Sequence, residues 1–295
     1  MAPRILPAAE HLARFALHRR GLASTTVRAH GVDLHVYDGA GRGRLPAVVM
    51  IHGLGAGGGS FGPMVTALLP HVRRVIVPEL PGHGFSAGAG EGRTVTPELL
   101  ADVIGDALDG LLTEPAVVLG NSLGGAVALG YALRRPERVR GLVLVSPAGA
   151  QLAADEWRAL VAAFDLDTTA EARRFLERVY HRPPWFLALF AHEFPALLRR
   201  PAVREILASA TPEHSPTPDA LAALAMPILL LWGRSERLLP ASALAWFRQH
   251  LPPQTVVEEP EGFGHAPQLE QPGRLAARVL EFAKDCVGSG GVSTP

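Results

Sequence analysis

The sequence predicts an α/β fold in which a mostly parallel sheet is covered by helices on both faces. Short, fully apolar runs alternate with helical patterns along the chain, and such runs are typical of parallel strands buried on both faces. The alternation is broken once, between about residues 147 and 225, where helical runs are interrupted by several prolines. At 295 residues, the chain is long enough for one large domain or for one domain with an insertion.

Composition and charge exclude several classes of partner. The 28 Lys and Arg residues balance the 28 Asp and Glu residues, so no basic surface predicts binding to nucleic acid. No apolar run approaches the ~18 residues of a membrane span, and the N-terminal region lacks the apolar core of a secretory signal. We therefore expect no membrane partner. The protein is expected to be a monomer or a homodimer. The single cysteine, Cys286, excludes an internal disulfide and predicts a reducing, cytoplasmic compartment.

Eight extended segments are expected. The first two flank Gly31 and form a hairpin, because glycine favours the tight turn that joins antiparallel strands. The other six are short and apolar, which predicts buried strands. In chain order, the eight segments are residues 26–30, 33–37, 47–51, 74–77, 116–119, 141–145, 227–232 and 255–258.

Amphipathic spacing predicts the helices that connect these strands. Leu12, Phe15 and Ala16 lie at helical spacing within an arginine-containing helix over residues 8–20. A later helix is expected to begin at Thr96, whose side chain can accept an N–H bond of the first turn. Further helices are expected at residues 61–69, 126–133, 153–164 and 171–180.

The stretch Gly120-Asn-Ser-Leu-Gly124 fits the pattern G-x-S-x-G and lies between a buried strand and a helix. This context is typical of a nucleophile elbow, a strained turn that raises a serine hydroxyl above the sheet. The glycines let strand and helix approach closely around Ser122, and the first N–H groups of the helix then face any oxyanion formed there. Taken alone, the five-residue pattern is also compatible with an ordinary tight turn.

A second glycine-rich stretch suggests a different function. Residues 53–58 read G-x-G-x-x-G directly after a strand, and Glu79 follows at the end of the next strand. This arrangement is typical of dinucleotide-binding proteins, in which the acid binds a ribose hydroxyl. However, a hairpin precedes the glycine strand, and neither His52 nor the proline-bounded loop 78–86 has a role there. The dinucleotide hypothesis also leaves Ser122 unexplained.

Five segments in fixed order carry a family resemblance. They are HGLG (52–55), PELPGHGFS (78–86), GNSLGG (120–125), WGRSERLLP (232–240) and GFGHAPQLEQP (262–272). Together they resemble the α/β-hydrolase family, in particular its cap-bearing esterases, C–C hydrolases and haloperoxidase-like enzymes, over roughly residues 25–283. The resemblance implies a mostly parallel eight-stranded sheet with helices on both faces, a helical cap after the sixth strand, and the chain order nucleophile, acid, histidine.

The segment boundaries follow from the same pattern. We expect the α/β-hydrolase core at residues 1–146 and 226–287, with the helical cap at residues 147–225 inserted between them. Residues 288–295 are rich in glycine and serine and are expected to form a disordered tail.

A serine hydroxyl becomes a good nucleophile only when a base takes its proton. Of the histidines after Ser122, His265 is the best candidate, because it lies in a glycine-flanked loop after the last strand and can reach back over the sheet. The base needs a carboxylate that fixes its tautomer. Glu236 follows the strand at 227–232, at a position where the family usually has Asp, and is the expected acid.

The expected oxyanion donors are the backbone N–H groups of Leu54 and Leu123, and the glycines at 53, 55 and 57–59 would let the backbone approach a substrate oxygen. The insertion is rich in aromatic residues, which predicts an apolar roof over the nucleophile. The residues expected to contact substrate are Gly53, Asn121, Trp185, Phe186, Phe190 and Phe263.

We therefore expect a serine hydrolase that cleaves small carboxylic esters with apolar, short-to-medium acyl chains through an acyl-enzyme, without cofactor or metal. Serine at the elbow argues against the family's dehalogenases and epoxide hydrolases, which need Asp there. A C–C hydrolase of the meta-cleavage-product type is the alternative enzyme. Asn121 favours it, but Ala266 stands where those hydrolases usually have Trp. A non-catalytic binding module on the same fold is the alternative of another class.

Overall fold

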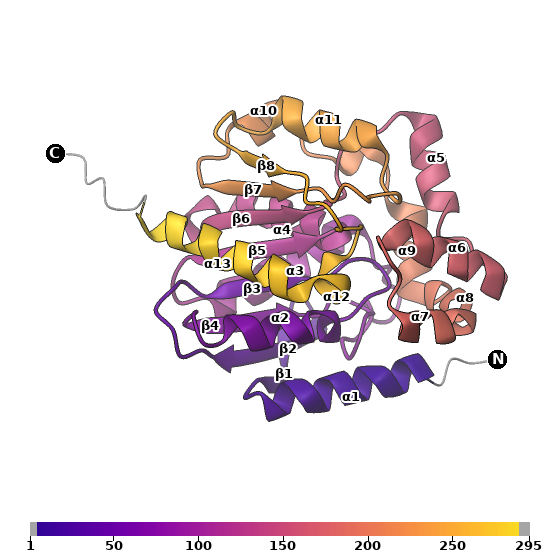
Figure 1. Cartoon of the computed structure of the whole chain (residues 1–295), viewed down its shortest axis with the longest axis horizontal. Coiled ribbons are helices and arrows are strands. Elements are labelled where there is room, and N and C mark those ends of the chain that lie inside the picture. The colour runs from indigo at the N-terminus through magenta and orange to yellow at the C-terminus, as the bar shows by residue number, and fades with distance from the viewer. Residues whose placement is uncertain (1–4, 289–295) are drawn as a thin grey trace.

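A single eight-stranded sheet runs through the centre of the protein, with helices on both sides (Figure 1). The computed structural model describes residues 5–288. The strand order is β1-β2-β4-β3-β5-β6-β7-β8. The β1–β2 and β2–β4 pairs are antiparallel, and every other neighbouring pair is parallel. The α/β fold and the number of strands predicted from the sequence are confirmed.

All eight strands fall on segments predicted from the sequence. The hairpin turn consists of His30 and Gly31, both with positive φ, as expected for a two-residue turn that matches the twist of the strands. The strands are β1 (Ala23–Ala29), β2 (Val32–Ala40), β3 (Val48–Ile51), β4 (Arg74–Pro78), β5 (Ala116–Asn121), β6 (Val139–Val145), β7 (Ile228–Leu231) and β8 (Val256–Glu258).

The helices on the two faces of the sheet connect the strands. As expected, Thr96 caps α3 by accepting the N–H of Leu99 at 3.3 Å. The helices outside the β6–β7 connection are α1 (Ile5–Arg19), α2 (Gly62–Leu68), α3 (Pro97–Leu111), α4 (Leu123–Arg134), α11 (Ala241–His250), α12 (Pro267–Glu270) and α13 (Pro272–Gly288). Short 3₁₀ turns lie at η1 (Gly58–Phe61) and η2 (Pro136–Arg138). Gly288 ends α13 instead of opening a tail, and residues 289–295 lie outside the described part of the chain.

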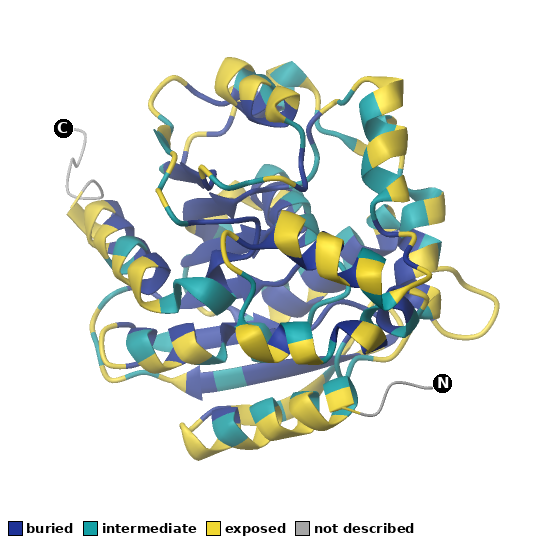
Figure 2. Cartoon of the chain, turned by 45° about the vertical axis from the view of Figure 1, so that its right-hand side comes forward, coloured by how far each residue is buried: buried dark blue, intermediate teal, exposed yellow. Residues whose placement is uncertain are grey.

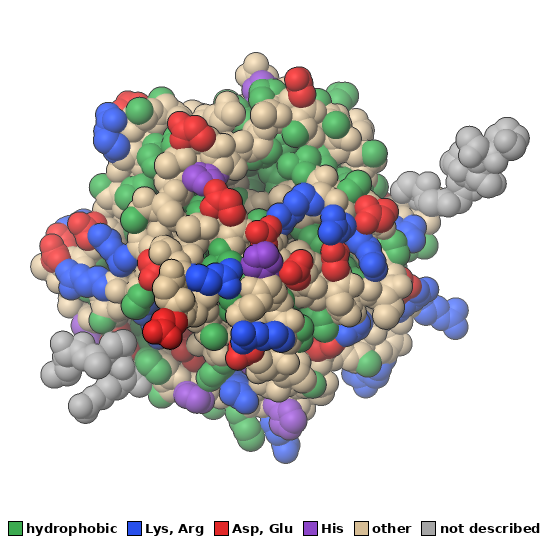
Figure 3. Space-filling model, turned by 180° about the vertical axis from the view of Figure 1, so that it is seen from behind, with side chains coloured by type: hydrophobic (Ala, Val, Ile, Leu, Met, Phe, Trp, Pro, Cys, Tyr) green, Lys and Arg blue, Asp and Glu red, His purple; other side chains and the backbone are tan. Residues whose placement is uncertain are grey.

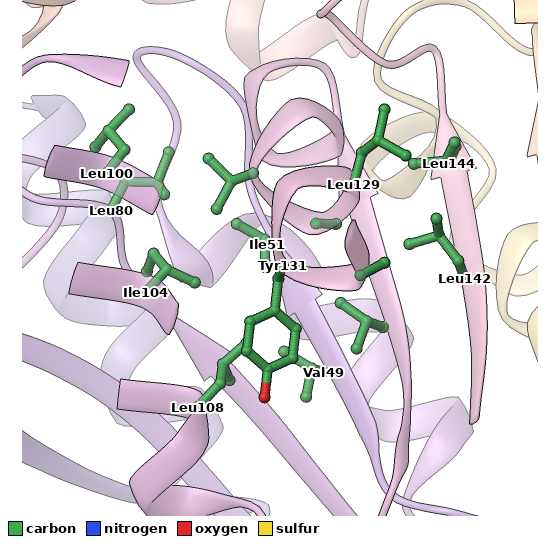
Figure 4. Packing of buried hydrophobic residues seen from close by; sticks show 14 of the residues in the cluster. Val49, Ile51, Leu80, Leu100, Ile104, Leu108, Leu129, Tyr131, Leu142 and Leu144 are labelled. Carbon is green, nitrogen blue, oxygen red and sulfur yellow. The ribbon is translucent and has the colours of Figure 1, made fainter. Parts of the chain in front are cut away.

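The core has two apolar layers, one on each face of the sheet. Along β3, Val49 and Ile51 belong to one layer, and Val48 and Met50 belong to the other, because successive strand side chains point to opposite faces. The first layer packs against α3 and α4 (Figure 4), and the second packs against α2 and α13. Buried residues accordingly concentrate in the strands and on the inward faces of these helices (Figure 2).

The segment between β6 and β7 contains only helices. They are α5 (Ala154–Ala162), α6 (Thr169–Val179), α7 (Trp185–Leu189), α8 (Phe194–Leu198), α9 (Pro201–Ser209) and α10 (Pro218–Ala222), with 3₁₀ turns η3 (Ala191–Glu193) and η4 (Pro212–His214). Phe164, Phe175 and Leu187 form a third apolar cluster with Leu238 and Ala266, which lie in core loops. Leu221 of α10 packs with the sheet layer instead. The division into a cap at residues 147–225 and a core stays a prediction.

Candidate active site

Ser122 lies on a sharp turn between β5 and α4, with φ 55° and ψ −122°. Such a positive φ in a residue with a side chain costs roughly 1–3 kcal/mol. The two flanking glycines are sterically required. A Cβ on Gly120 would collide with the backbone of Gly124, and a Cβ on Gly124 would collide with the carbonyl of Ile51. The local geometry is therefore the strand–turn–helix expected from the sequence.

Ser122 and His265 line the same cavity, which has a volume of about 330 Å³. Its walls are mostly aliphatic and aromatic, and they come from the loop after β3, from α6 to α8, and from α1. No lysine or arginine of the described chain lines it. The cavity therefore presents a serine hydroxyl and an imidazole to an apolar space, where burial of apolar ligand surface away from water is favourable.

His265 Nδ1 lies 2.7 Å from Glu236 Oε2. The second carboxylate oxygen of Glu236 accepts the N–H groups of Leu238 and Leu239. Burial by itself would raise the pKa of Glu236, but the charge and hydrogen bond of His265 and the N–H of Leu239 lower it below its usual value. With Nδ1 bonded to Glu236, the Nε2 atom of His265 is left for the cavity.

Two backbone N–H groups near Ser122 are available to a ligand. Within residues 5–288, neither the N–H of Leu54 nor that of Leu123 donates to a protein acceptor. His52 holds the loop that carries Leu54: its Nε2 accepts the N–H of Leu80 at 3.0 Å, and its Nδ1 lies 2.9 Å from the carbonyl of Gly53. Burial lowers the pKa of His52, so the neutral ring that these two bonds require is the favoured form.

The carboxylate of Glu79 is held by the protein itself. It accepts the N–H of Gly58 at 2.8 Å and the N–H of Phe85 at 2.7 Å, and it lies 3.0 Å from His35 Nδ1. Burial alone would raise the pKa of Glu79, but the bonds from His35 and Phe85 lower it below its usual value. A Cβ on Gly84 would collide with this carboxylate. Glu79 thus joins two glycine-rich loops, and this accounts for the spacing that resembles a dinucleotide site.

A family model described as the alpha/beta hydrolase fold matches residues 46–272. The chain belongs to the α/β-hydrolase family. Among curated relatives of this α/β-hydrolase, the pimeloyl-[acyl-carrier protein] methyl ester esterase of Xanthomonas oryzae pv. oryzae (strain MAFF 311018) is 32% identical. That match covers 81% of this chain and 96% of the relative. The esterase of the same name from Nitrosospira multiformis is 29% identical, over 82% of this chain and 96% of the relative. The chain is a carboxylic ester hydrolase.

Solved structures show the same fold at lower sequence identity. A bacterial membrane phospholipase A superposes with a TM-score of 0.79 at 23% identity and covers 96% of this chain and 91% of its own. Naproxen esterase from Bacillus subtilis superposes with a TM-score of 0.74 at 22% identity, and the match covers 92% of this chain and 96% of the esterase. The meta-cleavage product hydrolase from Pseudomonas fluorescens IP01 superposes with a TM-score of 0.71 at 23% identity, and the match covers 88% of this chain and 97% of the hydrolase. Within residues 5–288, no helix of this α/β-hydrolase is both long and apolar enough to cross a membrane.

The predicted substrate contacts are only partly brought together. Gly53 and Phe186 line the cavity. Trp185, Phe190 and Phe263 do not. Trp185 is 76% exposed on the outer side of α7, Phe190 directly follows that five-residue helix, and Phe263 is buried in the sheet layer beneath α13. Helical spacing shows which side chains share a face, but not which face the rest of the fold will cover, so contact of these three side chains with a substrate stays a prediction.

Asn121 reaches the cavity wall, but its side-chain amide is engaged elsewhere. Its Nδ2 donates to the carbonyls of Val145 and His265, at 3.0 and 2.8 Å, and its Oδ1 accepts from Gln268 at 2.9 Å. Asn121 therefore ties the elbow to the loop that carries His265. Both N–H donors of its amide are thus used within the protein.

Sequence reasoning missed two parts of the site. Leu6, Ala9 and Ala13 of α1 line the cavity, although this helix is expected from its periodicity alone. Glu270 accepts the N–H groups of Gly264 and His181, and so links the His265 loop to the end of α6. The only sequence signal for Glu270 is that an acid lies five residues after His265. The hydrogen bonds that it accepts become visible only in the folded chain.

Proposed function

We propose that this ester hydrolase uses Ser122 as nucleophile, His265 as general base and Glu236 as the group that orients the base. The oxyanion is bound by the N–H groups of Leu54 and Leu123. The observation that supports this most strongly is the buried 2.7 Å pair of His265 and Glu236, in the same cavity as a serine on a strained turn.

The proposed reaction follows from these positions. As Ser122 Oγ bonds to the ester carbonyl carbon, its proton passes to His265 Nε2, and the carbonyl oxygen becomes an oxyanion. The imidazolium is stabilised by Glu236 through Nδ1–H. When the tetrahedral intermediate collapses, the bond to the alcohol oxygen breaks, and His265 gives its proton to that oxygen. Water then attacks the acyl-enzyme with His265 again as base, which releases the acid and restores Ser122.

The cavity supports a neutral, apolar acyl group of short to medium length. Its wall has no lysine or arginine of the described chain to pair with an anionic substrate. Each buried CH₂ contributes about 0.8 kcal/mol, so binding improves with chain length until the volume of about 330 Å³ is filled. The same features disfavour the C–C hydrolase alternative, because its dienoic acid substrate is anionic and the amide of Asn121 is already engaged.

A second candidate substrate comes from the curated relatives. Their name specifies the methyl ester of a pimeloyl group on acyl-carrier protein, and they match 81% of this chain at 32% identity. Such a substrate would place a small alcohol group at Ser122 and a longer acyl chain in the cavity. The cytoplasmic location expected from the single cysteine stays a prediction.

Initial rates on p-nitrophenyl esters from acetate to palmitate test the proposal, with Ser122→Ala as the control for enzyme-dependent hydrolysis. The expected optimum lies near butyrate or hexanoate. The methyl ester of a pimeloyl thioester and an aromatic meta-cleavage dienoic acid are measured in parallel. An optimum at palmitate contradicts the short-to-medium acyl preference. A higher kcat/KM for the dienoic acid than for every ester overturns the proposed specificity.

A further inference from the structure

Most exposed large hydrophobic side chains of the described chain lie on two helices. Residues 5–288 contain eight such side chains, and six of them are on α1 or α7. The three on α1 lie on its outward face, which is exposed along its length in Figure 2. The six are Ile5, Leu12, Phe15, Trp185, Phe186 and Leu189.

These two helices flank the opening of the cavity. The carboxylate of Glu193, in the η3 turn that packs against α7, accepts the N–H groups of Ile5 and Leu6 at the start of α1. Figure 1 shows α7 beside the N-terminal end of α1. Leu6 and Phe186 both line the cavity, and Phe186 is also 40% exposed. The cavity therefore reaches the surface within the apolar patch.

The charge beside this patch is positive. Arg19 ends α1 and Arg20 follows it, whereas the only acid in α1 is Glu10, which is paired with Arg200 at 3.3 Å. By contrast, basic and acidic side chains are intermingled on the face shown in Figure 3. An apolar row with neighbouring arginines and no free acid on the same helix favours a surface that is both apolar and negatively charged.

We propose that α1 and α7 dock the enzyme onto anionic lipid surfaces. Leu12, Phe15, Trp185 and Leu189 enter the apolar layer, and Arg19 and Arg20 face the anionic headgroups. An ester dissolved in that layer then lies next to the opening of the cavity. The search for an apolar run of ~18 residues tests for a helix that crosses the bilayer. It does not test for an amphipathic helix that lies in the interface.

A lipid surface fits the patch better than a folded protein partner does. The side chains lie on two separate helices, and only Trp185 and Phe186 form a ring contact with each other. Leu12, Phe15, Trp185 and Leu189 are each between 61% and 76% exposed. A protein partner would need a matching pocket for each of these side chains to reach the close packing of an interface. An acyl layer accepts them without shape complementarity.

Co-sedimentation of the full chain with vesicles tests the proposal. One set of vesicles is phosphatidylcholine alone, and the other contains phosphatidylglycerol as well. Wild type is expected to partition onto the anionic vesicles, and the double variant Leu12→Ser/Phe15→Ser is expected to bind at least ~10-fold more weakly. Arg19→Glu/Arg20→Glu should lose the preference for anionic vesicles, and salt should abolish the difference from wild type.

The matched control is Val256→Ser/Val287→Ser, which removes the two exposed large hydrophobic side chains that residues 5–288 have outside the patch. It should bind vesicles like wild type. Leu12 and Phe15 do not line the cavity, so their variant should keep wild-type activity on a water-soluble ester and the wild-type unfolding midpoint. If that variant is unfolded, Leu189→Ser on α7 provides the same test.

Binding is measured without turnover, so a failure of docking is distinct from a failure of the proposed esterase specificity. The proposal is overturned if wild type does not sediment with anionic vesicles, or if the α1 variant binds as well as wild type does. It is also overturned if light scattering shows that the patch is covered by a second copy of the chain. Capture by acyl-carrier protein without any binding to vesicles would assign the patch to a protein partner instead.

Discussion

His265 Nδ1 is 2.7 Å from Glu236 Oε2, and the two side chains are only 5% and 1% exposed. Glutamate is one methylene longer than the aspartate that is usual at this position in similar enzymes. The additional length is accommodated because the other oxygen, Oε1, accepts the N–H groups of Leu238 and Leu239 at 2.8 and 3.0 Å. The turn after β7 thus fixes the carboxylate, and the carboxylate in turn fixes the imidazole.

Replacing Ser122 by alanine removes only the hydroxyl, so we expect a folded protein with at least ~10³-fold lower kcat on p-nitrophenyl butyrate. Loss of the positive-φ strain is not expected, since alanine is strained there as well. The measurement is kcat of the purified variant, with its unfolding midpoint as a check of folding. Activity close to that of wild type would rule out Ser122 as the nucleophile.

His265→Ala should be about as damaging as Ser122→Ala, because neither group performs the attack without the other. The double variant is therefore expected to retain the kcat of the single variants, to within about threefold. Steady-state rates of the two single variants and the double variant give the result. Losses that multiply in the double variant would show that the two residues act independently.

Glu236→Gln should lower kcat strongly, because a neutral amide can stabilise the wrong imidazole tautomer; in a serine protease the equivalent exchange costs about 10⁴-fold. Glu236→Asp is the matched control. It keeps the charge, restores the usual residue, and should keep substantial activity. If Glu236→Gln turns over like wild type, another carboxylate orients His265.

Glu270→Gln should lower kcat by roughly 10- to 100-fold with little change in KM, because a small displacement of the base is costly. An amide cannot accept hydrogen bonds at both ends, so one of the bonds to Gly264 and His181 is lost. The control is Glu261→Gln, which removes only an exposed ion pair with Arg234. An increase in KM alone would mean that Glu270 shapes the cavity and does not position His265.

Glu79 should contribute stability that depends on pH. Its pKa is lower in the folded chain than in the unfolded chain, where it is about 4.3. Its stabilising effect is therefore complete above the unfolded pKa and is lost as the pH falls through the lower folded pKa. Glu79→Gln should lower the free energy of unfolding by about 1–3 kcal/mol at neutral pH, and the deficit should shrink in acid. Urea unfolding over a pH series measures this, and a deficit independent of pH would contradict it.

The sequence alone predicted the features that depend on neighbours along the chain. Short apolar runs predict six of the eight strands, because burial on both faces leaves few polar positions, and the turn at Gly31 predicts the hairpin of the other two. The glycines at 120 and 124 predict the turn at Ser122, because only glycine fits where strand and helix touch. The chain order of Ser122, Glu236 and His265 as nucleophile, acid and base is what the resemblance to the α/β-hydrolases implies for the motifs after the predicted strands.

Tertiary structure alone decided the features that depend on residues far apart in the sequence. The amphipathic pattern of α1 predicts a helix, but its place beside the cavity depends on Glu193, 188 residues from Ile5. Periodicity likewise cannot show that Trp185 faces solvent while Phe186 faces the cavity. From the sequence, Asn121 and Glu79 are interpreted as ligand-binding groups, because their hydrogen-bond partners within the protein are not visible there. A polar side chain binds whatever the folded chain brings within reach, and local sequence does not encode that distance.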